Sequence, residues 1–241
     1  MDVKTKAVAL SATDYKESDK MILLYSLEYG KISVHARGIR KNSAKLKFCA
    51  DQFCFGQYEL AQTNGRFTLK TCEQLESFYS LREDIVRYYS ACVIAECLSN
   101  YTEEGQSDPY LFVETLKALE SLEEKKEPLA VVLRYLLGFF KLQGIALQLD
   151  SCISCGNRSQ RLFLDLPRGG LVCDNCREAE SSAVSARALS VCKMMDGISY
   201  DKTDNINASL DALKDALNLC YKYVSHSYFP LKSLRELIKL A

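Results

Sequence analysis

Residues 52–77 have the sequence QFCFGQYELAQTNGRFTLKTCEQLES, and this stretch decides the fold of the first part of the chain. It contains two runs rich in aromatic and aliphatic residues, Gln52–Gln62 and Phe67–Ser77, on either side of Asn64-Gly65. Asn-Gly favours a tight turn between two antiparallel strands, because both residues accept a left-handed backbone. The stretch therefore predicts a β-hairpin.

Three further runs with strand character precede this hairpin. They are Lys6–Thr13, Lys20–Ser26 and Lys31–Arg37, separated by turn-forming residues such as Tyr29-Gly30. Five short strands with no helical pattern among them are typical of a small barrel or a sandwich. A barrel is favoured, because so few strands could hardly cover two sheets.

The apolar pattern changes to helical spacing from about Leu81 onward. Ser107-Asp108-Pro109 supplies a capping residue followed by proline, which predicts a helix over Tyr110–Glu124. Glu127-Pro128 begins another over Leu129–Gln143 in the same way. Three more helices are expected later in the chain, at Ser185–Met195, Ala208–Ser227 and Leu231–Leu240. The second part is therefore predicted to be an all-α helical bundle.

Four cysteines interrupt this helical part with the spacing of metal ligands. Cys152 and Cys155 form one C-x2-C pair, Cys173 and Cys176 form another, and seventeen residues separate the pairs. Each pair places two thiolates on one tight turn, and the loop brings the pairs together as a tetrahedral zinc site. Four sulfur ligands leave no open position, so the zinc would be structural. The alternative is four unligated core cysteines at coincidental spacing.

Composition limits the class of protein. The chain has 241 residues, is 48% hydrophobic and has a formal net charge of zero, so it can form a packed core and is not basic overall. Its longest apolar stretch, Leu129–Leu142, contains Arg134 and Lys141 and is too short for a membrane span. The N-terminus lacks the apolar core of a signal peptide. The seven cysteines outside the array are scattered among apolar residues, as reduced buried thiols are, so a cytoplasmic location is expected.

Positive charge is concentrated after the third predicted strand. Residues 31–47 contain six cations and no acidic residue, and Gly38 and Asn42-Ser43 predict a flexible loop. Flexible cations beside a barrel suit a phosphate backbone, because they neutralise charge without requiring a base sequence. The alternative is a solvated loop that maintains solubility. The candidate DNA-binding residues are Lys31, Arg37, Arg40, Lys41, Lys45 and Lys47.

Aromatic side chains in the first eighty residues could stack on bases. Most of them are expected to be core residues instead; the candidates are Tyr15, Tyr25, Tyr29, Phe48, Phe53, Phe55, Tyr58 and Phe67.

Motifs for catalysis are absent from the sequence. The two histidines, His35 and His226, are isolated, and there is no phosphate-binding glycine loop and no dinucleotide fingerprint. A zinc deaminase would need an H-x-E before its C-x-x-C, and the chain has none. A binding protein is therefore predicted rather than an enzyme.

Five ordered segments resemble the bacterial RecO family of recombination mediators, in its zinc-bearing form. Tyr15 to Lys20 is similar to the Y-x-E-x-D-[RK] opening of that family, and Gly30 to Lys41 to its G-K-x-x-x-x-A-R-G-x-R-[KR] segment. The other three segments are Leu75–Asp84 at the passage into the helices, Leu149–Cys176 with its L-D-x-C lead-in, and His226–Leu234 with the ending H-x-x-x-P-L-K-S-x. Ser227-Tyr228-Phe229 departs from the pattern by being bulkier than usual.

The resemblance implies an α+β protein with an N-terminal OB-fold barrel at residues 1–79 and a helical domain at residues 80–241. A four-cysteine zinc finger would occupy residues 150–177. The family's basic positions correspond to Arg37, Arg40 and Lys41 here, and Lys45 and Lys47 extend the loop on charge alone. Such proteins bind single- and double-stranded DNA, anneal complementary strands, engage the C-terminal tail of single-stranded DNA-binding protein and, with RecR, help load RecA. A position at the bacterial nucleoid is expected.

Two other functions remain open from the residues. An RNA-binding zinc protein of translation would also combine a small barrel with a zinc finger, and a preference for RNA over DNA of the same sequence would identify it. A protein–protein adaptor with a merely solvated basic loop would show partner binding without nucleic-acid binding.

Overall fold

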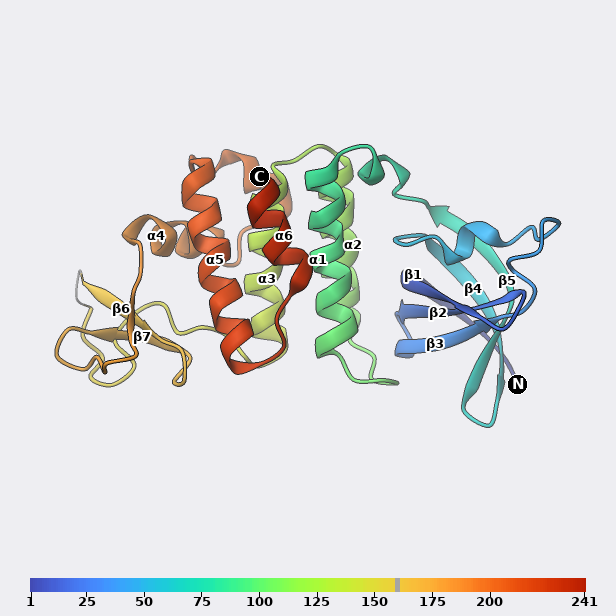
Figure 1. Ribbon diagram of the computed structural model, residues 1–241, viewed down its shortest axis with the longest axis horizontal. Coiled ribbons are helices and arrows are strands. Elements are labelled where there is room, and N and C mark those ends of the chain that lie inside the picture. Colours follow the sequence, from blue (N-terminus) through green and yellow to red (C-terminus); the bar gives the residue numbers. More distant parts are fainter. Residues whose placement is uncertain (159–160) are drawn as a thin grey trace. The chain divides into compact units, whose positions relative to one another are not determined.

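The computed structural model describes residues 1–158 and 161–241 of the chain (Figure 1). These residues form two compact units. The first unit contains residues 1–84 and 95–123, and the second contains residues 85–94 and 124–241, so that helix α1 (Ile85–Tyr101) contributes to both. The domain boundary between residues 79 and 80 stays a prediction from the sequence.

The first unit is built on a closed five-stranded barrel, as predicted. Its strands are β1 (Asp2–Tyr15), β2 (Asp19–Ser26), β3 (Gly30–Ala36), β4 (Phe55–Thr63) and β5 (Arg66–Glu76) (Figure 1). They pair in the order β1-β2-β3-β5-β4, and β1 pairs with β4 to close the ring. A closed five-stranded barrel of this kind is OB-like.

The hairpin of residues 52–77 forms where the sequence predicts it. Thr63 pairs with Arg66, and Asn64 and Gly65 both have positive φ, at 49° and 73°. Two successive left-handed residues match the twist of the flanking strands, which is why Asn-Gly is suited to this turn.

One joint of the barrel is much shorter than the others. β3 and β5 are parallel and are in register only at Val34 with Phe67 and His35 with Thr68. The other neighbouring strands are antiparallel, and β1 and β4, for example, are in register from Asp2 to Val8 of β1. The barrel therefore closes through few hydrogen bonds at the β3–β5 edge.

Alternating side chains fill the barrel, and one helix covers part of it. Ile22, Leu24 and Tyr58 are fully buried in its core. Helix α2 (Pro109–Glu123) places the Phe112 ring against Tyr25, with 6.3 Å between ring centroids. As the sequence predicts, Asp108 caps this helix, because its carboxylate accepts a hydrogen bond from the Leu111 N–H at 3.0 Å.

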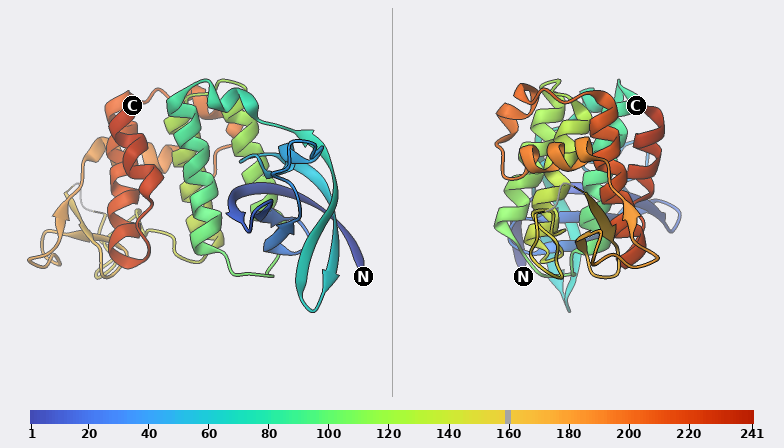
Figure 2. Two further views of the ribbon diagram at one scale, coloured as in Figure 1. Left: turned by 45° about the vertical axis from the view of Figure 1, so that its right-hand side comes forward. Right: turned by 90° about the vertical axis from the view of Figure 1, so that its left-hand side faces the viewer.

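The second unit is a bundle of helices (Figure 2). The bundle is built around α3 (Pro128–Leu142), a helix that is apolar on most of its surface. Helix α5 (Leu210–Ser227) packs against α3, α4 (Ala186–Met195) and α6 (Lys232–Leu240). Glu127 caps α3 as predicted, because its side chain accepts a hydrogen bond from the Leu129 N–H at 3.3 Å. Ser209 caps α5 by accepting a hydrogen bond from the Ala212 N–H. No helix among residues 1–158 and 161–241 is long and apolar enough to cross a membrane.

A small sheet carries the cysteine pairs. Strand β6 (Leu162–Asp165) and the turn after it lie between the two cysteine pairs. The structure adds β7 (Gly170–Cys173) and β8 (Ser182–Ala183), in the order β7-β6-β8.

Candidate nucleic-acid interface and metal centre

The basic loop, residues 37–47, is attached to the barrel at its base rather than flexible throughout. The N–H of Lys41 donates to the Gly38 carbonyl at 3.1 Å, and that of Ala44 donates to the Lys41 carbonyl at 3.0 Å, which makes two consecutive turns. Ile39 is only 5% exposed and joins the barrel core. Gly38 has a φ of +64°, which a residue with a Cβ adopts at a cost. These contacts hold the base of the loop on the barrel, whereas the flexibility predicted from Gly38 and Asn42-Ser43 stays a prediction.

Asp19, at the start of β2, connects the two family-like segments of the barrel. Its carboxylate accepts a hydrogen bond from the Gly38 N–H at 2.7 Å and contacts His35 Nε2 at 2.7 Å. The Gly38 N–H and then His35 lower the pKa of Asp19 to about 2. The carboxylate is therefore ionised at any pH at which nucleic-acid binding would be measured.

Four of the six candidate cations extend from the loop with exposed side chains: Arg37, Lys41, Lys45 and Lys47. In the part of the chain that the structure describes, Arg37, Lys41 and Lys45 have no hydrogen-bond or ion-pair partner. The Lys47 ammonium donates to the nearby carbonyl of Asn42, at 3.4 Å. These side chains are available to an external anion.

Arg40 is exposed but engaged with the β1–β2 turn. Its Nη2 lies 3.2 Å from Asp14 Oδ2, and its Nη1 donates to the Glu17 carbonyl at 3.3 Å. The Asp14 side chain is 57% exposed, so this ion pair is screened by solvent and salt.

Lys31 differs from the other five candidate cations in its burial and in the distant segment that its ammonium contacts. Its Nζ donates to the Ser99 carbonyl in the last turn of α1 at 2.7 Å, and its own carbonyl accepts from the Gly105 N–H. It is half-buried. Its assignment as a DNA contact stays a prediction.

A groove of about 1050 Å³ runs along the outside of β3 beside the β4–β5 hairpin. Lys31 and Arg37 line it, but the other four candidate cations do not. Arg66, which follows Asn64-Gly65 in the hairpin, also lines the groove, and its side chain is exposed. In an OB fold, the face of strands 2 and 3 and the loop between strands 4 and 5 form the surface that binds oligonucleotides.

The groove also includes aromatic residues. Tyr15 is 42% exposed, and its ring contacts the His35 ring edge-on with 5.3 Å between centroids. Phe67 lines the same groove but is 9% exposed. Of the eight aromatic candidates, all of which are described, only Tyr15 is exposed, so the expectation that most are core residues is confirmed.

Arg66 was not found by sequence reasoning, because it lies far along the chain from the basic loop. The available indication was its place directly after the Asn64-Gly65 turn, where a side chain at a hairpin end faces solvent. The short β3–β5 joint brings this hairpin beside β3 and so places Arg66 and Arg37 on one groove.

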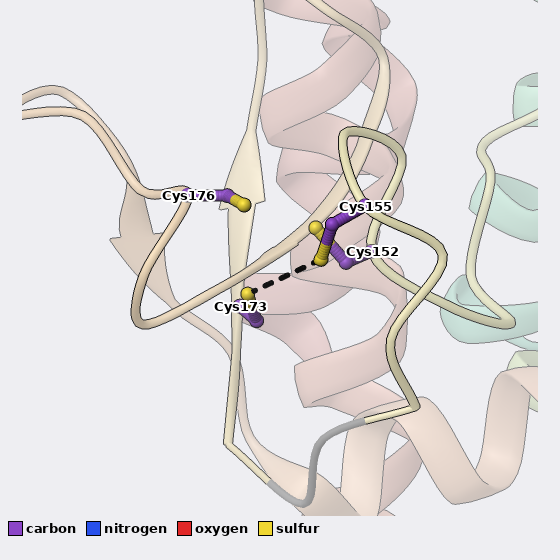
Figure 3. Close-up of side chains that lie close together, drawn as sticks. All are labelled: Cys152, Cys155, Cys173 and Cys176. Atoms are coloured by element: carbon purple, nitrogen blue, oxygen red, sulfur yellow. Dashed lines mark hydrogen bonds between the residues drawn. The ribbon is translucent and has the colours of Figure 1, made fainter.

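The four predicted metal ligands come together in the second unit. The Sγ atoms of Cys152, Cys155, Cys173 and Cys176 all lie within 4.8 Å of one another (Figure 3). The Sγ atoms of Cys155 and Cys173 are 3.7 Å apart. Tetrahedral zinc with Zn–S bonds of about 2.3 Å requires sulfur atoms roughly 3.8 Å apart. The geometry fits a metal ion held by four thiolates.

Tight turns create this arrangement. The Gly156 N–H donates to the Cys152 carbonyl at 2.8 Å, and the Cys176 N–H donates to the Cys173 carbonyl at 3.0 Å. The N–H of Ile153 bonds to the Leu171 carbonyl, which fixes the first turn to β7. Each C-x2-C pair therefore directs both thiols to one side.

Backbone groups prepare the cluster for a cation. Burial raises the pKa of the Cys152 thiol, but the N–H groups of Cys173, Cys155 and Ser154 outweigh it and lower the pKa to about 6. Hydrogen bonding with the neighbouring Cys155 thiol raises the pKa of Cys176 to about 12. Four thiolates at this distance repel one another, and a bound metal ion removes that repulsion.

Three of the four arginines of the finger are paired within it. Arg168 Nε donates to Asp165 at 2.8 Å, and Arg177 and Arg161 lie 3.2 and 3.9 Å from Asp174. Asp165 is only 5% exposed, and the Arg168 guanidinium lowers its pKa. The finger therefore presents less free positive charge than its arginines suggest.

Comparison with known proteins covers both units. The family model Recombination protein O N terminal matches residues 1–78, and Recombination protein O C terminal matches residues 82–235. DNA repair protein RecO of Bacillus pumilus is 31% identical over 176 residues, which cover 73% of this chain and 69% of that protein. The DNA repair protein RecO of Clostridium novyi is 29% identical over 93% of this chain and 89% of its own length. That of Listeria monocytogenes serotype 4a is 28% identical over 98% of this chain and 95% of its own length.

Proposed function

Since the chain belongs to the RecO family of DNA repair proteins, we propose that it is a recombination mediator that binds single- and double-stranded DNA without sequence preference. It would anneal complementary strands and, with RecR, help load RecA onto DNA coated by single-stranded DNA-binding protein. The observation that carries the proposal is the groove on the OB-like barrel, whose lining includes Arg37, Arg66 and the exposed ring of Tyr15.

Two kinds of contact are available in the groove. Guanidinium groups bind phosphates and release counterions, which gives affinity without reading bases. An exposed ring offers a surface on which any base can stack. The loop cations Lys41, Lys45 and Lys47 add positive charge outside the groove, where a second strand or a duplex could be held.

Annealing follows from such contacts without nucleotide hydrolysis. Two strands repel through their phosphates, and a cationic surface that holds one strand loosely lowers the cost of approach by its complement. Base pairing supplies the driving force. Contacts that ignore base sequence are required, because tight readout of base edges would obstruct pairing.

Zinc is the metal we propose for the cysteine cluster. Four thiolates in a tetrahedral arrangement are the usual donor set of structural zinc, and one ion would join the two cysteine turns into a finger. The site has no role in a reaction in this proposal, and the protein acts by binding rather than by catalysis. We place it in the bacterial cytoplasm, at the nucleoid, with RecR and the C-terminal tail of single-stranded DNA-binding protein as direct partners and RecA as an indirect one.

The double substitution Arg37→Ala and Arg66→Ala tests the groove. We expect affinity for a single-stranded oligonucleotide to fall at least about tenfold in low salt, because two guanidinium groups no longer bind phosphates. The slope of log K against log salt should become shallower by about 1.4, from roughly 0.7 per neutralised phosphate on single strands. Fluorescence anisotropy across a salt series, together with an annealing assay, measures both quantities.

The matched control removes two cations from the second unit, by Arg158→Ala with Lys222→Ala. Both side chains are exposed. Unchanged affinity of the groove variant, or an equal decrease in the control, would contradict the proposal. An RNA of the same sequence serves as the second ligand, and strong preference for it would indicate a protein of RNA metabolism.

A further inference from the structure

Two carboxylates at the β1–β2 turn contact the basic loop, and they do so in different ways. Asp19 holds the backbone of the loop, whereas Asp14 holds the guanidinium of one of its cations. We propose that Asp19 is a positioning residue that sets the DNA-binding arrangement of the loop, and that Asp14 competes with DNA for Arg40. The proposal rests on the proposed DNA binding and assigns opposite roles to two neighbouring charges.

The positioning role follows from where the hydrogen bonds of Asp19 end. One carboxylate oxygen accepts from the Gly38 N–H at 2.7 Å, directly after Arg37, and the other contacts His35 Nε2 at 2.7 Å. The adjacent Ser18 carbonyl accepts from the Arg40 N–H at 2.9 Å. The loop backbone is therefore held on both sides of the buried Ile39.

This attachment determines where two cations emerge. Arg37 precedes Gly38 and lines the groove, and Arg40 is the residue whose N–H is held by Ser18. Gly38 adopts its left-handed conformation at this point, so a change in its hydrogen bond would alter the direction of the chain. Without the Asp19 carboxylate, Arg37 would no longer be fixed toward the groove.

The competing role follows from the exposure of the Asp14–Arg40 pair. The two side chains are 57% and 39% exposed, and their charged atoms are 3.2 Å apart. Asp14 also lies 3.9 Å from the Lys20 ammonium. An exposed pair of this kind contributes little to stability, and a phosphate can replace the carboxylate on the guanidinium.

A purely electrostatic role and a positioning role for Asp19 predict opposite changes in DNA affinity when its charge is removed. If only charge mattered, removal of either acid from a DNA-binding face would strengthen binding, because each repels phosphates. Under our proposal, Asp14→Asn strengthens binding and Asp19→Asn weakens it. Asp19→Glu keeps the charge but moves the carboxylate by one methylene, so it too should weaken binding.

The experiment is titration of a fluorescent single-stranded oligonucleotide with the full chain and the three variants, between about 50 and 200 mM salt. We expect Asp14→Asn to bind about two- to threefold more tightly, which matches the free energy of an exposed ion pair. Asp19→Asn and Asp19→Glu should bind at least about fivefold more weakly, with a salt slope shallower by about 0.7 for each phosphate that is no longer bound. The amide signal of Gly38 in an NMR spectrum should move in both Asp19 variants and stay in place in Asp14→Asn.

Folding and function are separated by two further measurements. Thermal melting followed by circular dichroism identifies a variant that fails to fold. If Asp19→Asn fails to fold, Asp19→Glu still tests the proposal, because it keeps the charge and moves only the carboxylate. Asp19→Asn in the Arg37→Ala, Arg40→Ala background should have no further effect on affinity, because the cations it positions are already gone. Tighter binding by Asp19→Asn, or wild-type binding by Asp19→Glu, would overturn the inference while leaving DNA binding intact. A wild-type chain that binds no DNA would instead reject the proposed function.

Discussion

Replacing Cys152 with serine is expected to release the metal and to lower the unfolding free energy of the second unit by at least about 4 kcal/mol. The Cys152 thiol is one of the four clustered sulfurs and is only 1% exposed, in a small core with Phe163 and Val172. Structural zinc supplies on the order of 10–16 kcal/mol of apparent folding free energy in isolated zinc-finger peptides. A site that loses one of its four ligands retains little of this folding free energy. Elemental analysis should fall from one zinc per chain to nearly none, and the melting temperature should fall with it.

Cys192→Ala is the matched control for this experiment. Cys192 is 1% exposed and lies in α4 of the same unit, but it is outside the metal cluster. It should cost about 1 kcal/mol, as small reductions of core volume do, and leave the metal content unchanged. Because the groove that we propose for DNA binding is in the first unit, the Cys152 variant should keep strand binding below its melting temperature. A wild-type protein that is as stable without metal as with it would contradict the assignment of the four cysteines as ligands of a structural metal ion.

Replacing Gly30 with alanine is expected to destabilise the first unit by at least about 3 kcal/mol. Gly30 has a φ of +59°, and a Cβ there would lie 1.8 Å from the carbonyl oxygen of Gln106. A side chain in the left-handed region costs roughly 1–2 kcal/mol on its own, and here the backbone must also move apart. The displacement would strain the neighbouring contacts of Lys31 with Gly105 and Ser99. Chemical unfolding followed by circular dichroism measures the decrease in stability.

Gly65→Ala separates the cost of the left-handed backbone conformation from the cost of the steric clash. Gly65 has a φ of +73°, but nothing lies within 4 Å of a Cβ built there. It should therefore cost only the conformational part, about 1–2 kcal/mol. Equal decreases in stability at the two positions would show that the close approach of residue 106 has no energetic consequence.

The strands and helices could be predicted from sequence because their determinants are local. Asn64-Gly65 specifies its own turn, and Asp108 and Glu127 each cap the helix that follows them. The cysteine cluster was predictable for the same reason, since each C-x2-C forms its own turn and one loop joins the two.

Contacts between distant segments were not predictable in this way. Gly38 suggested flexibility, because nothing near it in sequence indicates that the Asp19 carboxylate holds its N–H. The Asp14–Arg40 ion pair depends on the pairing of β1 with β2 and of β2 with β3. The position of Arg66 on the groove depends on the pairing of β3 with β5. Charge composition identified the cations, whereas the fold decides which of them are free.

The barrel has one edge with few backbone hydrogen bonds, between β3 and β5, and this edge lies beside the groove. β3 and β5 are in register at only two positions, and His35 and Phe67 belong both to this edge and to the groove lining. Local opening of a sheet requires the least work where the fewest backbone hydrogen bonds must break. We expect amide hydrogens along this edge to exchange with solvent before those of the long β1–β4 edge. In the proposed function, transient widening there would let the groove accommodate first a single strand and then the broader duplex that forms from it.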